Sequence, residues 1–108
     1  MGITKTEGFS SEINLMAERL KALGHPARLY IMQYLANCDR CIGNDLVEEL
    51  PLAQPTISKH LSELKRVGLV QGTIDGKQMN YCINKEGWEA IQQFVVGISI
   101  KLDTPKCC

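Results

Sequence analysis

Long apolar runs are missing from this 108-residue sequence. No stretch approaches the ~20 apolar residues that a membrane-spanning helix needs, which argues against a helical membrane protein. The opening residues MGITKTEGFSSE lack the basic start and apolar stretch of a secretory signal peptide. Repeats and low-complexity segments are also missing. We therefore expect one globular domain located in the cytoplasm.

The sequence has no net charge, because 12 Lys and Arg residues balance 12 Asp and Glu residues. This neutrality argues against a protein that coats nucleic acid indiscriminately. The charges are nevertheless segregated along the chain. Residues 54–77 hold four basic and two acidic side chains, whereas residues 36–53 hold one basic and four acidic side chains. A locally basic face on a neutral protein is compatible with site-specific DNA binding.

A disulfide framework is marked by an even number of cysteines together with an export signal. This sequence has neither. We therefore expect free thiols, and free thiols that are not simply buried indicate metal binding or redox chemistry. The five cysteines are Cys38, Cys41, Cys82, Cys107 and Cys108.

Apolar spacing and capping residues predict five helices and a β-hairpin. The order of these elements is helix, helix, helix–turn–helix, hairpin, helix, which is that of a winged helix–turn–helix. We expect a mainly α fold with a small β-hairpin, in which residues 1–9 form a flexible arm, residues 10–101 the domain, and residues 102–108 a cysteine-ending tail. The predicted helices begin near Ser10 or Ser11, at Pro26, near Asn44, at Gln54 and after the capping residue Asn84, and the predicted strands cover residues 69–74 and 78–84 around Asp75-Gly76.

The fourth predicted helix has the features of a DNA recognition helix. Its stripe of Ile57, Leu61 and Leu64 would face the core, and short hydrogen-bonding side chains occupy its N-terminal end, which meets base edges in such helices. Gln54 can pair with adenine, and basic side chains can neutralise phosphates. An alternative is an amphipathic helix with a solvated face, and for His60 a capped or partly buried histidine. The candidate DNA-binding residues are Gln54, Thr56, Ser58, Lys59, His60, Lys65, Arg66 and, beside the hairpin turn, Lys77.

The segments LKALGHPARLYIMQYL and DLVEELPLAQPTISKHLSELKRVGLVQGTIDGKQMNYCI resemble the ArsR/SmtB family of bacterial metalloregulatory repressors, over roughly residues 17–95. The resemblance implies a homodimer that releases operator DNA when a metal, metalloid or thiol-reactive signal binds. It implies a dimer interface made by the first and last helices, whose apolar stripes at 13/16/20 and 88/91/95/98 exceed what one core needs. It also implies DNA-facing roles for Gln54, Thr56, Ser58, Lys59 and His60.

The cysteines are the best candidates for binding the inducer. Arsenite and antimonite favour thiolates, and the flexible pair Cys107–Cys108 suits their capture. The resemblance implies a thiol motif at the start of the third helix, but Gly43 and Asn44 stand where the second thiol is expected. Cys38 or Cys41 would then complete the site. Cys82 is either a third ligand or a buried structural thiol.

Several alternatives for the inducer stay open. Cadmium or lead also accept thiolates, a redox or persulfide switch needs only two thiols, and the C-x-x-C at 38 and 41 could belong to a zinc clamp. A zinc or cobalt site on the last helix is disfavoured, because His25 and His60 both lie elsewhere.

Two other classes of function are less well supported by the sequence. No feature places a cysteine near a histidine with a third orienting group, so we expect neither an enzyme nor an organic cofactor. A winged-helix module that binds protein instead of DNA would leave the polar set Gln54, Thr56 and Ser58 unexplained.

Overall fold

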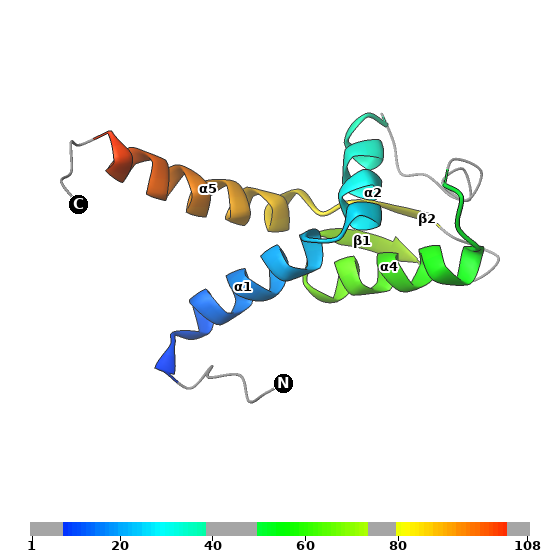
Figure 1. The fold of residues 1–108 in the computed structure, drawn as a ribbon, viewed down its shortest axis with the longest axis horizontal. Helices are drawn as coiled ribbons and strands as arrows, with labels where there is room; N and C mark the ends of the chain where they lie inside the picture. Colours follow the sequence, from blue (N-terminus) through cyan, green and yellow to red (C-terminus); the bar gives the residue numbers. More distant parts are fainter. Residues whose placement is uncertain (1–7, 39–49, 74–79, 104–108) are drawn as a thin grey trace.

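The computed structural model describes residues 8–38, 50–73 and 80–103. Helices and strands follow one another in the predicted order (Figure 1). The third predicted helix, the Asp75-Gly76 turn and most of the predicted arm and tail lie outside the described residues. The elements are α1 (Ser11–Leu23), α2 (Pro26–Ala36), α4 (Gln54–Arg66), β1 (Val70–Thr73), β2 (Asn80–Ile83) and α5 (Lys85–Leu102).

The helix starts agree with the predicted caps. The Ser10 hydroxyl accepts a hydrogen bond from the Ile13 amide at 3.1 Å, and the Asn84 side chain accepts one from the Gly87 amide at 3.4 Å. Such caps satisfy amides that have no partner within the helix. The start of α2 holds a cap that the sequence reasoning missed, because His25 Nδ1 accepts from the Ala27 amide at 3.0 Å.

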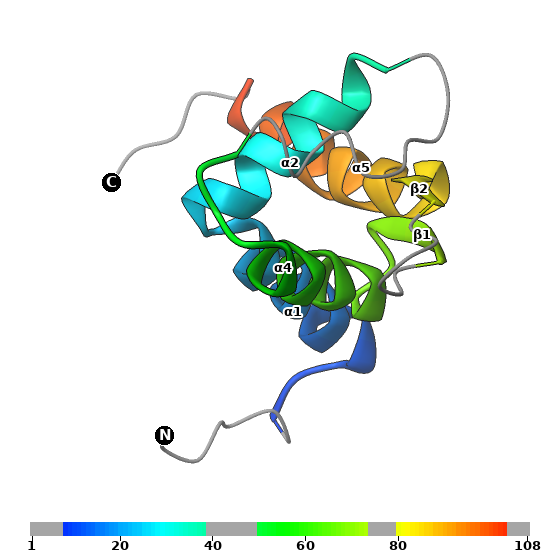
Figure 2. The same cartoon turned by 90° about the vertical axis from the view of Figure 1, so that its right-hand side faces the viewer.

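The core is built around α4. Ile57, Leu61 and Leu64 are all 0% exposed, which confirms the predicted buried stripe. Helices α1 and α2 and strand β1 all contact α4, and Figure 2 looks nearly along α4, with α2 above it and the hairpin beside it. The core therefore fixes which sides of α4 remain open to solvent.

The hairpin pairs β1 and β2 in antiparallel register, with Val70 opposite Ile83 and Thr73 opposite Asn80. Gly72 has a positive φ of 124°, and a Cβ there would lie 2.1 Å from the Asn80 carbonyl oxygen. Only glycine tolerates this backbone conformation and this approach. The two strands of the hairpin therefore approach each other closely at Gly72.

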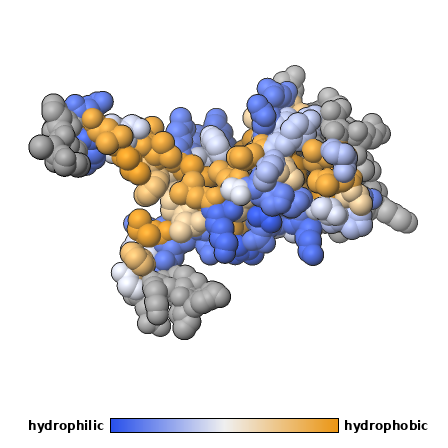
Figure 3. Space-filling view, in the orientation of Figure 1, coloured by the Kyte–Doolittle hydropathy of each residue, from blue (hydrophilic) through white to orange (hydrophobic). Residues whose placement is uncertain are grey.

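Helix α5 extends away from the body of the molecule (Figure 1). Much of the predicted stripe on α5 is exposed in the single chain, including Trp88, Val95 and Ile98. On α1, Ile13 and Leu20 of the predicted stripe are also exposed. Figure 3 shows the hydrophobic surface that results along α5. On α2, Leu29 is 53% exposed, although it lies at helical spacing from the buried Met32. Among the described residues, every helix is too short or too polar to cross a membrane.

Candidate nucleic-acid interface

The N-terminal end of α4 is the part of the predicted recognition helix that stays open. Thr56 and Lys59 are exposed, and Gln54 and Ser58 are half-buried. The residue before the helix, Ala53, has no side chain that could cap it. Because the first amides of a helix carry a partial positive charge, an end without a side-chain cap favours a nearby anion such as phosphate.

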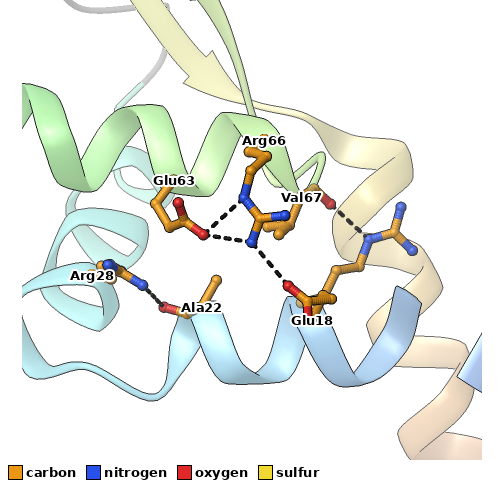
Figure 4. A network of polar contacts seen from close by, with 7 residues as sticks. Glu18, Ala22, Arg28, Glu63, Arg66 and Val67 are labelled. Atoms are coloured by element: carbon orange, nitrogen blue, oxygen red, sulfur yellow. Dashed lines mark hydrogen bonds and ion pairs between the residues drawn. The ribbon is translucent and has the colours of Figure 1, made fainter. Parts of the chain in front are cut away.

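The C-terminal end of α4 is joined to α1 and is less open than the sequence suggested. Arg66 donates to Glu63 through Nε at 2.9 Å, and its Nη2 lies 2.9 Å from Glu18 on α1. Figure 4 shows this network, in which the hydrogen bond from Arg66 lowers the pKa of the Glu63 carboxyl. Two carboxylates thus offset the Arg66 charge, which disfavours its predicted role as a phosphate contact.

Two arginines that the sequence reasoning did not single out complete this junction. Arg19 Nε donates to the Val67 carbonyl at 3.0 Å, and Arg28 Nη1 donates to the Ala22 carbonyl at 3.3 Å. Their partners are backbone oxygens near helix ends, so they satisfy acceptors that the helices leave open. No pattern in the sequence identifies these contacts, because a carbonyl partner has no side-chain signature.

Lys65 lies at the base of the hairpin. Its Nζ donates to the Gly72 carbonyl on β1 at 2.6 Å. The ammonium group therefore holds α4 and β1 together, although it remains exposed to solvent.

His60 is directed toward the start of α2. Its Nδ1 accepts from Arg28 Nε at 3.1 Å, and its ring lies 4.6 Å from the ring of His25, measured between centroids. Burial, followed by the charges of His25 and Arg28, lowers the pKa of His60. The structure therefore favours the alternative interpretation, a partly buried neutral histidine, over a DNA contact.

The thiols lie in unlike environments. Cys38, at the end of α2, is a half-buried free thiol whose Sγ lies 3.3 Å from the Tyr34 carbonyl. Cys82 on β2 is disulfide-bonded, so the expectation of free thiols was wrong for this residue. Within the described ranges, no group of three His, Cys, Asp or Glu side chains is arranged to hold a metal ion. The remaining predicted site residues, Lys77, Cys41, Cys107 and Cys108, lie outside the described residues.

Comparison with known proteins identifies the family. The model of the arsR family of bacterial regulatory proteins matches residues 25–71. The transcriptional regulator Rv0081 of Mycobacterium tuberculosis, which is named as uncharacterized, is 39% identical over 69 residues, or 64% of this chain and 60% of Rv0081. The crystal structure of Rv0081 aligns with a TM-score of 0.60 and 30% identity, covering 86% of this chain and 96% of that chain. This chain belongs to the arsR family.

A second relative from the same organism is the HTH-type transcriptional repressor SmtB. It is 36% identical over 69 residues, which are 64% of this chain and 50% of SmtB. The match spans between half and 60% of the length of these two curated relatives. Membership of this family confirms the predicted resemblance and the winged helix–turn–helix, and it agrees with the expectation that the chain is not an enzyme.

Proposed function

We propose that this arsR-family chain is a transcriptional repressor that binds operator DNA in the cytoplasm. The observation that carries the proposal is the N-terminal end of α4, where short polar side chains surround a helix start without a side-chain cap. The buried stripe of α4 holds this end rigidly against the core. The relative SmtB is named a transcriptional repressor, which supports the direction of regulation.

The contacts of α4 divide the proposed roles among its residues. Gln54, Thr56 and Ser58 would read base edges, because short polar groups at a recognition-helix start reach into the major groove. Lys59, which is exposed, would contact phosphate. Lys77 keeps its proposed phosphate role from the sequence alone. Arg66 and His60 are left out of the proposed interface, because their side chains bind Glu18 and Arg28 respectively.

A DNA-binding measurement tests this division. Operator sites selected from a random-sequence pool would be titrated at several salt concentrations. We expect Thr56→Ala to relax preference at one base position by about 1–3 kcal/mol. Lys59→Ala should weaken binding to all sequences and reduce the salt slope by about one. Arg66→Ala is the matched control and should leave the slope unchanged. Salt-independent binding, or no binding at all, would instead favour the protein-interaction module.

We further propose a homodimer through the first and last helices. Large apolar side chains on α5, among them Val95, Ile98 and Ile100, are exposed in the single chain, and exposed apolar surface of this kind marks an interaction site. Sedimentation should give about 24 kDa, twice the chain mass of 12.0 kDa. Ile98→Asp should shift the protein to a monomer, whereas Lys101→Gln should not. A wild-type monomer that still binds an inverted repeat would contradict the proposal.

For the inducer we propose arsenite or antimonite, captured in the reduced protein by Cys107 and Cys108 and completed by Cys41 or Cys38. Cys38 supports this assignment because it is a free thiol. Soft thiolates favour such centres, and the thiols must lose protons, so binding should weaken as pH falls. Because Cys82 is disulfide-bonded, we leave it out of the proposed inducer site.

Replacing Cys107 and Cys108 by serine tests the inducer site. The double variant should bind DNA normally and no longer release it with arsenite. Parallel titrations with cadmium, lead and a persulfide donor distinguish the alternative inducers. If arsenite releases the double variant at the same concentration as the wild type, the tail is not the sensor.

A further inference from the structure

An apolar cavity of about 430 Å³ lies where α2 meets β2 and the start of α5. This volume falls within the range of small-molecule sites. Six of the eight described lining side chains are apolar, and the two polar ones are Gln33 and Lys85. Two large apolar members, Leu29 and Trp88, are 53% and 41% exposed, so the chain leaves them in contact with solvent.

The charge of the wall indicates the chemistry of a ligand. Lys85 is the single charged side chain among the described lining residues, and no acidic side chain joins it there. An apolar wall with one ammonium group suits an apolar molecule that carries one negative charge, because a small number of placed polar groups orients a ligand in such a pocket. The amide of Gln33 could donate a second hydrogen bond to a carboxylate.

We propose that this cavity binds a small apolar carboxylate, such as a medium-chain fatty acid, with Lys85 pairing the acid group. Among the described residues, neither Cys38, Cys82 nor the DNA-facing end of α4 lines this cavity, so the proposal does not depend on the proposed repressor function. The lining comes from the end of α1, from α2, from β2 through Ile83, and from α5. A ligand here therefore contacts the hairpin strand and α5 at the same time.

A second copy of the chain is the competing occupant, and the position of the apolar residues favours the small molecule. The exposed side chains Val95, Ile98 and Ile100 lie farther along α5, outside the cavity lining. They provide an apolar surface for a second copy, and of the predicted dimer stripe on α5 only Trp88 also lines the cavity. The cavity is instead formed within one chain, by elements that meet at the N-terminal end of α5.

Trp88 provides a direct reporter, since it is the only tryptophan in the sequence and it lines the cavity. The full chain would be titrated with octanoate while tryptophan emission is recorded, with octanol as the uncharged ligand of equal chain length. We expect a saturable change in emission, one octanoate per chain by calorimetry, and at least tenfold weaker binding of octanol.

Three variants test the assignment. Ala36→Phe, which fills the cavity, and Leu29→Gln, which places a polar group on its exposed wall, should each weaken octanoate binding at least tenfold. Lys85→Gln should keep octanol binding and abolish the preference for octanoate. Lys101→Gln, at the far end of α5, is the control and should behave as the wild type.

Three results would overturn the proposal. The first is an emission spectrum that is already that of a buried tryptophan and does not respond to octanoate, as expected if a second copy covers the cavity. The second is unaltered octanoate binding in both cavity variants, with folding verified by circular dichroism. The third is an undiminished preference for octanoate in Lys85→Gln.

Discussion

The contact between the first turn of α5 and the end of α4 makes a sharp prediction about Gly87. A Cβ added at Gly87 would lie 1.8 Å from the carbonyl oxygen of Gly68. Ordinary contact begins at 3.4 Å, so the two segments would have to separate by about 1.6 Å. The obstacle is backbone, which cannot rotate away as a side chain would. Gly68 itself has a φ of 84°, a conformation that favours glycine.

The expected cost follows from two opposing effects. Overpacking costs typically about 1–3 kcal/mol and occasionally more, and a backbone obstacle belongs at the upper end of this range. Replacing glycine by alanine within a helix recovers roughly 0.5–1 kcal/mol. We therefore expect Gly87→Ala to lower the free energy of unfolding by about 2 kcal/mol.

Urea unfolding followed by circular dichroism measures this change, at one fixed protein concentration because a dimer would make stability depend on concentration. With a slope of about 1–3 kcal/mol per molar urea, the midpoint should fall by roughly 0.7–2 M. Gly24→Ala is the matched control, since its Cβ would meet its nearest atoms at 3.6 Å and its φ is −78°. If Gly87→Ala and Gly24→Ala unfold at the same urea concentration, the close approach of α5 to Gly68 is refuted.

Three further predictions concern α4. Leu61→Ala, at a fully buried position, should cost about 2–5 kcal/mol in the same urea assay; a smaller loss would mean that the core closes over the cavity. Arg66→Ala removes exposed ion pairs, so its effect on the midpoint should be smaller than that of Leu61→Ala and should vanish in about 1 M NaCl. Because the pKa of His60 is lowered in the folded state, the unfolded chain binds more protons in mildly acidic solution. The wild type should therefore lose stability as pH falls below about 6.5, through the folded pKa. His60→Gln should show a weaker loss in that range, and an identical pH profile would contradict the burial of His60 beside His25 and Arg28.

Local features of the chain predicted much of the fold. The caps Ser10 and Asn84 and the proline at the start of α2 act over a few residues, and the structure confirms them. The stripe of α4 follows from helical periodicity, since residues three and four apart share a face. The thiol assignments could not be derived in this way, because a cysteine's spacing does not reveal its partner, and Cys82 was bonded against expectation.

Within the described residues, the sequence by itself determined which segments form helices and strands and which side of α4 is buried, and it also determined which family the chain resembles. Only the tertiary structure decided how the charged groups of α4 are used. Arg66 and Glu18 are 48 residues apart, and His60 and Arg28 are 32 apart. Helical periodicity assigns a side chain to a face, but the partner that meets that face depends on how helices pack. For this reason the N-terminal end of α4 remains the proposed DNA contact, whereas its C-terminal end is joined to α1.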